Sequence, residues 1–369
     1  MRRRFKGIGI IDPVGIKAGM DYYDLNLARG LRSAGFICYI YSNFIGESTH
    51  KFFAENGVTK GKQIIKFFFG VIKALLNARK ADLQYILIHS FSAEMKDLYV
   101  FVLAKFMGFK IINIAHDISG FANKDRKVIK KLIYTYLSDW IVVHNKFSKE
   151  CLLKQIGRND YTRIKVIPHG HFLDLPKKDI TKHSAREKLG IAEDVKLVLF
   201  FGQIKKQKGL DILINALKYV RSDIHLIIAG KPWKDDFSMY MNLIKEFGLA
   251  DRIIADIGYI DDDLRELYFK ATNLVVIPYR EIYQSGVLLM GMSYRIPVIA
   301  SNLKPNMEII EPFKSGLIFE SENHRDLAAT IDDFFERDFS NALIENSIKY
   351  LEESHSWSAI AKSYAEFLK

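Results

Sequence analysis

The chain has 369 residues, of which 49% are hydrophobic and 26% are charged. This length predicts two domains, and this composition is that of a soluble globular protein with large cores. The formal net charge of +11 and the sequence pI of about 9.3 favour anionic partners, which are nucleic acid, an anionic membrane surface or phosphorylated small molecules.

Residue counts argue against several classes of protein: disulfide-rich, zinc-binding, secreted and membrane-spanning. Two cysteines, Cys38 and Cys151, make neither a disulfide framework nor a zinc spacing, and their apolar surroundings predict buried thiols in a reducing compartment. The basic start has an apolar run of only a few residues that ends at Asp12-Pro13, which predicts a first strand and not a signal peptide. No stretch reaches the roughly 18 apolar residues that a membrane span needs.

In the first half of the sequence, short apolar strands alternate with helices, which predicts a parallel α/β sheet. The expected strands are 5–12, 36–41, 83–89, 110–115, 140–144 and 164–167, and the expected helices are 21–34, 60–80, 93–107, 127–137 and 149–156.

The loop after the first strand contains Gly15 and Gly19 but lacks the G-x-G-x-x-G dinucleotide fingerprint. Two interpretations stay open for it. One is a plain turn between strand and helix, and the other is a loop in which Gly19 lets a phosphate or sugar approach Met20.

Residues 60–80 predict a helix that is both very apolar and cationic. Its three adjacent phenylalanines cover a wider arc than one core-facing side needs. Such a helix can lie on an anionic bilayer surface, and the competing interpretation is a core-packing helix with lysines at its solvent edge. The residues expected to contact the membrane are Lys62, Lys66, Phe67, Phe68, Phe69 and Lys73.

A polar pair, His116-Asp117, follows the expected strand 110–115. Open α/β sheets place their ligands at the carboxyl ends of parallel strands, so this position favours a functional role for His116. A lone histidine elsewhere in a sequence is more often structural.

Residues 173–194 are polar and charged and read as a linker, after which the alternation restarts. The expected strands are 197–201, 224–229, 253–257, 274–278, 297–300 and 316–319, and the expected helices are 185–189, 211–219, 237–247, 263–270, one from near 285, 307–310 and 325–335, before closing helices. Two such blocks predict an α/β protein with two Rossmann-like, doubly wound domains facing a central cleft. Their expected bounds are 1–172 and 173–354, followed by a last helix in 355–369.

Two loops of the second half predict a site for a nucleotide diphosphate. The competing interpretation is an ordinary strand–loop–helix–strand unit in which Ser285 is a helix cap and the lysines are solvated. Lys205, Lys206 and Lys208 follow its first strand and can meet a diphosphate as point charges. The helix that begins near Ser285 offers free backbone N–H groups and the positive end of its dipole, and Gly286 allows close approach of an anion. Both loops follow parallel strands and are therefore expected at the same edge of the sheet.

These residues carry a resemblance to the retaining glycosyltransferases of the GT-B fold, in the large family four. The family pattern G-R-x-x-x-x-K-G aligns with residues 202–209, and its P-S-x-x-E-G-F-G…E-A-M-A-x-G-x-P-V-I-A-S aligns with residues 278–301. The family's H-D aligns with His116-Asp117, its V-I-P-H-G aligns with residues 166–170, and a closing tryptophan helix also matches. The resemblance covers nearly the whole chain.

The resemblance implies transfer of a hexose from a UDP- or GDP-linked sugar to a glycan or lipid-linked acceptor, with retention and without a metal or other cofactor. Residues 1–172 would bind the acceptor, residues 173–354 the nucleotide sugar, and the helix in 355–369 would pack back towards the first domain. The implied setting is cell-surface polysaccharide biosynthesis by a cytoplasmic enzyme held peripherally at the inner face of the plasma membrane.

The resemblance also implies roles for single residues. His116 would contact the donor sugar, Lys208 would stabilise the diphosphate leaving group, and Glu281 would bind a sugar hydroxyl. The residues expected to bind the donor are Gly19, Met20, Gln203, Lys205, Lys208, Ile260, Gln284, Ser285, Gly286 and Val287.

The sequence departs from the family pattern at three positions. Gln203 replaces the family arginine, with Lys205 as a substitute beside Lys208. Ile282 replaces the first glutamate, and Met290 replaces the second, which holds the ribose hydroxyls in relatives. The Gln284-Ser285-Gly286 version is similar to a Q-S-G subset of the family, in which the serine and backbone amides would take over the phosphate contact.

Two other functions compete with sugar transfer. A sugar-nucleotide epimerase can use the same two-domain architecture, and the lost glutamates suit a non-catalytic protein that binds glycan or lipid. Nucleic-acid binding fits the charge but lacks a reading motif.

Overall fold

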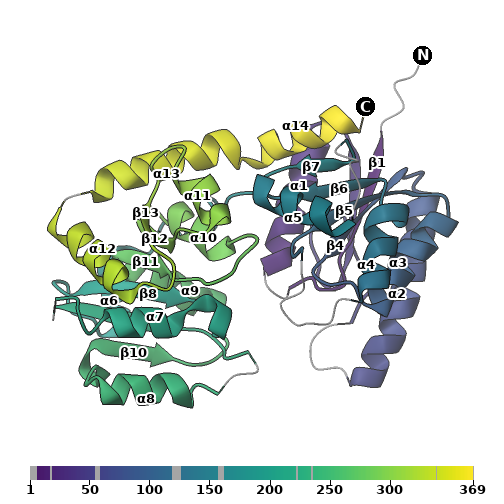
Figure 1. Cartoon of the computed structure of the whole chain (residues 1–369). Helices are drawn as coiled ribbons and strands as arrows, with labels where there is room; N and C mark the ends of the chain where they lie inside the picture. The colour runs from purple at the N-terminus through teal and green to yellow at the C-terminus, as the bar shows by residue number, and fades with distance from the viewer. Residues whose placement is uncertain are drawn as a thin grey trace. The chain divides into compact units, whose positions relative to one another are not determined.

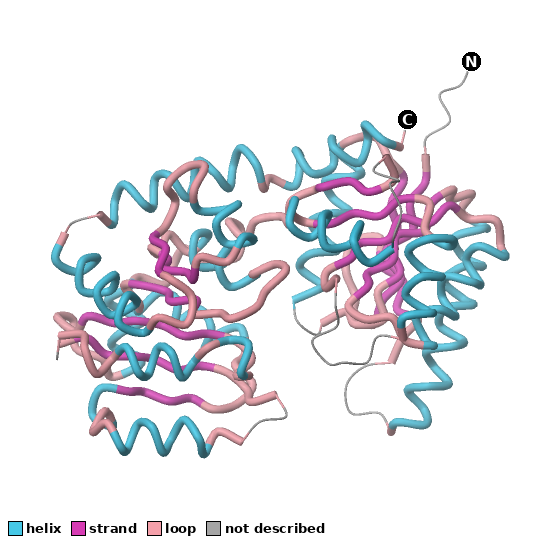
Figure 2. The backbone as a smooth tube through the Cα atoms, in the orientation of Figure 1, coloured by secondary structure: helices cyan, strands magenta, loops and turns pink. Residues whose placement is uncertain are grey.

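The structure, a computed structural model, describes residues 6–16, 19–54, 59–118, 126–156, 162–221, 223–233, 236–337 and 339–368. The chain separates into two compact units. Unit 1 comprises residues 1–170 and 355–369, and unit 2 comprises residues 171–354. Each unit is built on one parallel sheet with helices packed against it (Figures 1 and 2).

Unit 1 contains a seven-stranded sheet in the order β3-β2-β1-β4-β5-β6-β7, and every neighbouring pair is parallel. Its strands are β1 (Gly7–Ile11), β2 (Ile37–Ser42), β3 (Thr49–Lys51), β4 (Tyr85–Ser90), β5 (Lys110–Ala115), β6 (Trp140–Val143) and β7 (Ile164–Val166). Its helices are α1 (Met20–Ser33), α2 (Lys60–Lys80), α3 (Met95–Phe106), α4 (Lys127–Lys131), the π-helix η2 (Leu132–Leu137), α5 (Lys146–Ile156) and α14 (Trp357–Phe367).

The sheet of unit 1 is covered on both faces, which explains why β1 is buried along its whole length. Successive side chains of a strand point to opposite faces. Ile10 accordingly joins a core with α1 and α14, whereas Ile11 joins a core with α2 and α3. Helix α14 approaches α1 closely at Gly30, where an added Cβ atom would lie 2.6 Å from the carbonyl oxygen of Trp357.

Unit 2 contains a six-stranded parallel sheet in the order β10-β9-β8-β11-β12-β13. Its strands are β8 (Lys196–Phe201), β9 (Ile224–Ala229), β10 (Ile253–Asp256), β11 (Leu274–Ile277), β12 (Val298–Ser301) and β13 (Leu317–Phe319). Its helices are α6 (Lys182–Leu189), the 3-10 helix η3 (Lys206–Lys208), α7 (Leu210–Ala216), α8 (Ser238–Glu246), the 3-10 helix η4 (Ala250–Arg252), α9 (Asp262–Ala271), α10 (Gly286–Ser293), α11 (Lys304–Ile310), α12 (His324–Glu336) and α13 (Ser340–Ser354).

The prediction of two Rossmann-type sheets is confirmed, and the structure differs from it in detail. Strand β3 was not expected, because its three residues Thr49–Lys51 carry no apolar alternation. The single helix expected over 127–137 changes at Leu132 into a π-helix. The amide and the hydroxyl of Ser138 both donate to the carbonyl oxygen of Ile133, five residues earlier, which fixes the wider turn. Cys38 is buried as expected, whereas Cys151 is only half-buried.

Candidate functional site

The crevice of unit 2 lies between β8 and β11. From β8 the chain proceeds outward through β9 to β10, and from β11 it proceeds the other way through β12 to β13. The loops that follow β8 and β11 therefore leave the sheet in opposite directions, and such a switch point at the carboxyl ends of the strands is where open α/β sheets bind ligands. These two loops are the lysine loop (residues 202–209) and the β11 loop (residues 278–285).

The lysine loop is held close to the sheet by two glycines. Gly202 donates its amide to the carbonyl oxygen of Ala229 at 2.9 Å, which ties the start of the loop to the end of β9. Gly209 ends η3 in the left-handed region with φ 63°, and an added Cβ atom would lie 1.9 Å from the carbonyl oxygen of Pro278. Only glycine fits this position, because both the φ angle and the contact with the β11 loop exclude a side chain.

Tyr279 connects the two loops and was not anticipated from the sequence. Its ring is 1% exposed, and Lys208 Nζ lies 3.7 Å from the ring centroid. The side chain of Tyr279 also shares a hydrogen bond with Ser285, and burial raises the pKa of its hydroxyl. Lys208 and Ser285 therefore both contact one buried, neutral phenol, which brings the ammonium group and the start of α10 together at the switch point.

Arg280 fastens the same two loops by charge. Its guanidinium forms two hydrogen bonds of 2.7 Å to the carboxylate of Asp211 and one of 2.6 Å to Glu322. It also donates to the carbonyl oxygen of Lys206 at 2.9 Å, and its backbone amide donates to Gln207. A planar guanidinium can satisfy several acceptors at once, so this one side chain fixes the position of η3 relative to the β11 loop.

Helix α10 begins at the crevice with free donors. Ser285 is its N-cap, and the Ser285 hydroxyl oxygen accepts from the amide of Leu288 at 3.2 Å. Ser285 is only 3% exposed, and its hydroxyl caps the amide of Leu288 inside the helix start. Gly286 and Val287 are the first two residues of the helix, and their amides are not capped in this way. In the described part of unit 2 neither amide has a protein acceptor, and the space around Gly286 is open. An anion fits these two donors at the positive end of the helix dipole.

The other donor-binding candidates of unit 2 occupy the same edge of the sheet with different exposures. Gln203 and Glu281 are exposed, and Lys205 and Ile260 are half-buried, with Ile260 in the loop that follows β10. Gln284 carries a buried amide nitrogen that has no hydrogen-bond partner among the described residues. An unsatisfied buried donor is costly, and a ligand oxygen would relieve it.

In unit 1, the switch point lies between β1 and β4. The carboxylate of Asp12 accepts from the amides of Val14 and Gly15, which shapes the loop after β1. Gly19 is the N-cap of α1 with φ 73° and open space around it, and Met20 is buried at the helix start. The structure therefore places both expected residues at the unit 1 switch point, with room for a ligand at Gly19.

His116 is half-buried in a set of histidines that the strands of unit 1 bring together. Its Nε2 lies 2.8 Å from His89 Nδ1, and its Nδ1 lies 3.4 Å from His144 Nε2. His89 Nε2 in turn lies 2.9 Å from Asp24 Oδ1, and the ring of His116 stacks on Phe91 with centroids 4.5 Å apart. Both ring nitrogens of His116 thus have protein partners. Burial lowers the pKa of all three histidines, to about 4 for His89 and His144.

The sequence held a signal for these partners that a motif comparison passes over. Strands β1, β5 and β6 are followed at once by an aspartate or a histidine, β4 has a histidine as its penultimate residue, and strands of one parallel sheet end at one edge. The residues concerned are Asp12, His89, His116 and His144. Within the described residues, no group of three or more His, Cys, Asp or Glu side chains is arranged to hold a metal ion.

A family model described as glycosyl transferases group 1 matches residues 181–369, more than half of the chain. The chain belongs to this family. A glycosyltransferase of Methanocaldococcus jannaschii, MJ1607, is 28% identical to this family member over 260 residues, which are 68% of the chain and 65% of that protein. A GDP-mannose:glycolipid 4-beta-D-mannosyltransferase of Xanthomonas campestris is 31% identical over 134 residues, 36% of the chain and 37% of that enzyme. The matched region spans less than two thirds of either relative.

Solved structures show the same fold in glycosyltransferases of GT-B type. Sucrose-phosphate synthase from Thermosynechococcus elongatus superposes with a TM-score of 0.78 at 20% identity and 98% coverage of both chains. Anabaena HepE in complex with UDP and glucose superposes with a TM-score of 0.75 at 19% identity, over 98% of this chain and 99% of that one. At these identities the likeness concerns the fold, and the GT-B architecture expected for this group 1 family member is confirmed.

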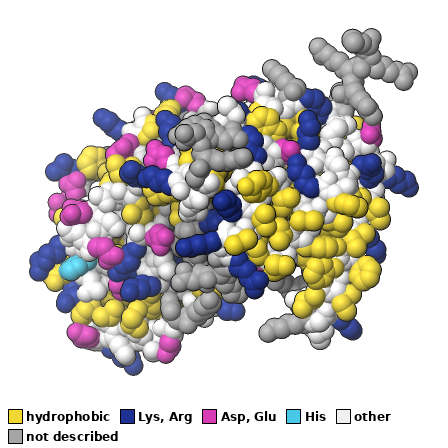
Figure 3. All heavy atoms as spheres, turned by 45° about the vertical axis from the view of Figure 1, so that its right-hand side comes forward, with side chains coloured by type: hydrophobic (Ala, Val, Ile, Leu, Met, Phe, Trp, Pro, Cys, Tyr) yellow, Lys and Arg dark blue, Asp and Glu magenta, His cyan; other side chains and the backbone are white. Residues whose placement is uncertain are grey.

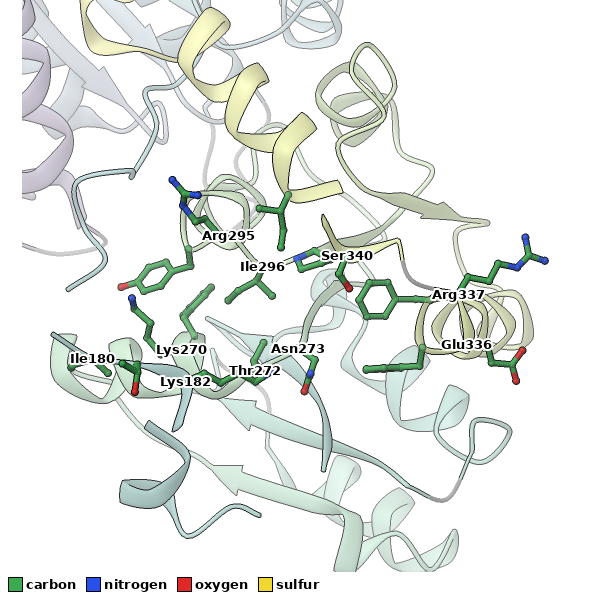
Figure 4. Close-up of a pocket in the computed structure, with 17 residues that line it drawn as sticks. Ile180, Lys182, Lys270, Thr272, Asn273, Arg295, Ile296, Glu336, Arg337 and Ser340 are labelled. Atoms are coloured by element: carbon green, nitrogen blue, oxygen red, sulfur yellow. The ribbon is translucent and has the colours of Figure 1, made fainter. Parts of the chain in front are cut away.

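A cavity of about 580 Å³ in unit 2 lies away from the crevice. Asn273 and Pro297, which line it, directly precede β11 and β12, so the cavity is at the amino-terminal edge of the sheet. Figure 4 shows that the side chains of Glu336 and Arg337 point away from it. The candidate donor residues lie at the opposite, carboxyl-terminal edge, and the cavity is not part of that site.

Helix α2 of this family member carries a large apolar surface. Phe69 is 61% exposed and Phe68 39% exposed against Tyr99 of α3, whereas Phe67 is half-buried against the core. The lysines expected at this surface, Lys62, Lys66 and Lys73, are all exposed. No helix in the described part of the chain has the length and apolarity needed to cross a bilayer.

Proposed function

We propose that this protein transfers a hexose from a nucleotide-diphosphate sugar to a glycan or lipid-linked acceptor, with retention at the anomeric carbon. The observation that carries the proposal is the convergence of Lys208 and the α10 N-terminus on Tyr279 at the switch point of unit 2. Unit 2 binds the nucleotide sugar, and unit 1 binds the acceptor. The UDP and glucose bound to HepE and the GDP-mannose donor named for the Xanthomonas enzyme support donors of the UDP or GDP class.

The chemistry follows from where charge develops. Breaking the bond between sugar and phosphate leaves an oxocarbenium-like sugar and a diphosphate that gains negative charge. Lys208, assisted by Lys205, supplies ammonium charge to that leaving group, and the amides of Gly286 and Val287 supply fixed donors from the helix N-terminus. Ammonium groups and hydrogen-bond donors that are already in place need no reorganisation in the transition state. Electrostatic stabilisation of the leaving group is therefore the largest single contribution to the rate.

The remaining site residues take supporting roles. Gln203 and Ile260 line the nucleotide side of the unit 2 crevice, Gln284 offers its unsatisfied amide, and Glu281, which is exposed, binds a sugar hydroxyl. In unit 1, Gly19 and Met20 border the acceptor or phosphate site, and His116 contacts the donor sugar. The reaction as proposed needs no metal, because the ammonium groups and helix amides neutralise the diphosphate.

Lys208→Ala tests this proposal, with Lys218→Ala as the matched control. Lys218 Nζ lies 3.9 Å from the Phe247 ring centroid, and a second ring, Tyr219, lies 5.8 Å away. Both variants therefore remove one charge and one close cation–π contact, but only Lys208 lies in the lysine loop at the crevice. A thermal-shift panel of UDP- and GDP-sugars first selects the donor. The turnover of Lys208→Ala should then fall by about 10²–10³-fold with the fold intact, whereas Lys218→Ala keeps normal turnover.

Three results would contradict the proposal. Near-normal transfer by Lys208→Ala would remove the assigned role of the lysine loop. Interconversion of two sugar nucleotides without an acceptor would indicate an epimerase, and donor binding without hydrolysis or transfer would indicate a binding protein. Product analysis by NMR reports whether the anomeric configuration is retained, and transfer in EDTA reports whether a metal is needed.

The acceptor side of the proposal is a membrane-presented glycan or lipid, as in cell-surface polysaccharide biosynthesis. The support is an apolar face that neighbouring helices of unit 1 share, namely α2, α3, α4 and η2. Figure 3 shows apolar side chains gathered in the same unit, with Lys and Arg among them. The exposed apolar residues of this face are Ile64, Ile65, Phe68, Phe69, Ile72 and Leu76 of α2, Met95, Val102 and Phe106 of α3, and Val128, Leu132 and Tyr136 of α4 and η2.

The charge on the apolar face selects an anionic bilayer as the partner. Lys62, Lys66 and Lys73 lie on α2, and Lys127 and Lys131 lie on α4, all of them exposed. Each basic residue near an anionic surface contributes about 1 kcal/mol, so the three α2 lysines correspond to roughly 100-fold tighter binding. In this proposal the apolar side chains enter the interface, and the protein is held peripherally at the cytoplasmic side of the plasma membrane.

Vesicle co-sedimentation tests the membrane contact. The full chain should bind vesicles of phosphatidylcholine mixed with phosphatidylglycerol and bind weakly to phosphatidylcholine alone. Changing Ile65 and Phe69 together to serine should abolish binding, whereas the control Ile254→Ser, at a residue of unit 2 that is 41% exposed, should not. Equal binding by all variants, or no preference for the anionic lipid, would contradict this part of the proposal.

A further inference from the structure

A row of buried side chains in unit 1 forms a continuous line of hydrogen-bonding atoms. The histidine row, defined as Asp24, His89, His116 and His144, is linked by contacts of 2.9 Å, 2.8 Å and 3.4 Å in that order. At its far end, His144 Nδ1 lies 3.0 Å from the carbonyl oxygen of Ile167. Helix α1 supplies Asp24, and the ends of the three strands β4, β5 and β6 supply the histidines, so the row depends on the tertiary structure alone.

The direction of every hydrogen bond in the row follows from its last member. A carbonyl oxygen only accepts hydrogen bonds, so His144 Nδ1 must donate to Ile167. In a neutral ring, His144 Nε2 is then unprotonated and can only accept. His116 Nδ1 must then donate to His144, and His89 Nδ1 must donate to His116 Nε2. All three rings therefore carry their proton on Nδ1.

The near end of the row then requires one more proton. In this arrangement His89 Nε2 is unprotonated and is a hydrogen-bond acceptor, and it lies 2.9 Å from Asp24 Oδ1. A carboxylate facing this nitrogen would set two acceptors against each other, so the contact needs a proton. Burial lowers the pKa of His89 and raises that of Asp24, which puts this proton on Asp24 rather than on the ring. Asp24 is 0% exposed, and its carboxyl group shares a side-chain hydrogen bond with the carboxyl group of Asp12. Two buried carboxyl groups in contact cannot both be ionised, so this end of the row retains a proton.

None of the described Lys or Arg side chains is among the groups that shift the pKa of Asp24. Tyr23 places its ring edge-on to the rings of His89, His116 and His144 with centroids 5.4–6.2 Å apart. Burial raises the pKa of Asp24 well above its usual range and that of the neighbouring Asp12 to about 7. The titratable groups that face the row from the elements packed against it are Asp12, Asp21, Tyr23, Cys38, His169, His355 and Tyr364.

We propose that Asp24 is a positioning residue that holds one proton and thereby fixes, through His89, which nitrogen of His116 donates and which accepts. We call the row loaded when Asp24 is protonated and unloaded when it has lost that proton. In the loaded row, Asp24 O–H and the three Nδ1–H groups all point towards Ile167. When the row loses one proton to water, the three remaining protons move to Nε2 and point towards Asp24, and His144 loses its hydrogen bond to Ile167. Four protons thus become three protons and one released proton.

This inference deepens the proposed transfer reaction and rests on it only for its effect on activity. The contact from His116 Nδ1 to His144 is the longest in the row at 3.4 Å, so a sugar hydroxyl at His116 would replace this partner first. In the loaded row that nitrogen is a neutral donor, and in the unloaded row it is an acceptor. Asp24 would then determine whether His116 Nδ1 donates or accepts in its hydrogen bond to the sugar, although Asp24 does not contact the sugar. The carboxylate of a catalytic triad orients its histidine in a similar way.

The direct test is ¹⁵N NMR of the full chain labelled at histidine, between about pH 5 and pH 9, where tautomers are read from the ring nitrogens. At the acidic end, His89, His116 and His144 should be neutral with the proton on Nδ1, whereas a free histidine is charged there. As the pH rises, all three should change to Nε2–H with one common midpoint. Charged rings, rings with their proton on Nε2 throughout, or three separate midpoints would overturn the proposal.

Variants at Asp24 and His89 separate positioning from simple packing. The amide of Asp24→Asn can donate to His89 Nε2 but cannot lose a proton, so its three rings should keep Nδ1–H over the whole pH range. His89→Phe interrupts the row, and His116 should then lose its coupling to Asp24. His183→Gln, at an exposed histidine of unit 2, is the spectroscopic control. If Asp24→Asn titrates like the unaltered protein, the proposal is wrong.

The activity measurement distinguishes this inference from the proposed function. The pH profile of kcat/KM in the unaltered enzyme should show a limb with the NMR midpoint, and Asp24→Asn should lack that limb while its KM for the nucleotide changes less than threefold. A tautomer change seen by NMR in a protein that transfers no sugar would reject sugar transfer and leave the row intact. A transferring enzyme in which Asp24→Asn retains the limb would reject the positioning role.

Discussion

A methyl group added at Gly209 should disturb the donor site more than the same group at Gly248. Both glycines have φ 63°, and an added Cβ atom meets nothing within 4 Å at Gly248 but would lie 1.9 Å from the carbonyl oxygen of Pro278 at Gly209. The pair therefore separates the cost of the left-handed backbone from the cost of the collision between the lysine loop and the β11 loop.

The magnitudes follow from these two terms. A left-handed alanine costs about 1 kcal/mol, so Gly248→Ala should lower the melting temperature of a unit of this size by about 2–4 °C. Gly209→Ala adds an overpacking term of about 1–3 kcal/mol, because a backbone carbonyl cannot move aside as a side chain can, which gives about 5–15 °C in total. The displaced loop carries Lys208 away from Tyr279, so affinity for a nucleoside diphosphate should fall at least about tenfold, or 1.4 kcal/mol.

Calorimetry of the full chain and isothermal titration with UDP and GDP measure both effects, and hydrogen exchange over residues 202–209 shows whether the loop has moved. The interpretation requires that Gly248→Ala binds nucleotide normally. Equal losses of stability in the two variants, or normal nucleotide affinity in Gly209→Ala, would refute the argument that close contact of the two loops builds the site.

Three further predictions concern charge. Arg280→Lys loses the paired hydrogen bonds to Asp211 and should weaken nucleoside-diphosphate binding by about tenfold in titration calorimetry, since a point charge cannot replace a planar fork; an unchanged affinity would show that the clamp is dispensable. Asp12 has its folded-state pKa raised to about 7, so the folded state loses stability as pH rises from about 4 to 7, and Asp12→Asn should recover about 2–3 kcal/mol of that loss between pH 5 and pH 8 in urea titrations. His144 has its folded-state pKa lowered to about 4, so its stabilisation is complete above about pH 6.5 and is lost as pH falls towards 4; His144→Gln should flatten the stability curve by about 2–3 kcal/mol between pH 7.5 and pH 4.5, and an unaltered slope would contradict a neutral buried ring.

The sequence by itself determined the two parallel sheets and most of their elements. Strands that are buried on both faces must be almost wholly apolar, and helices between them must show a 3.6-residue period, so both leave a pattern in the order of residues. The same applies to Gly286 and Ser285 at the start of α10, because a helix start is a local feature. Short polar elements such as β3 left no such pattern, and η2 depends on a side chain of Ser138 that adds a bond across a wider turn.

Only the tertiary structure decided which side chains meet. The contact of Lys208 with Tyr279 and the clamp of Arg280 on Asp211 join residues 71 and 69 positions apart, and nothing in either local stretch specifies the partner. The histidine row is the stronger case, because its three histidines look like ordinary strand ends until three strands align their carboxyl ends along one edge, with Asp24 of α1 against them. Burial then removes water from these groups, and the direction of each hydrogen bond and the location of the shared proton follow from the neighbours that remain.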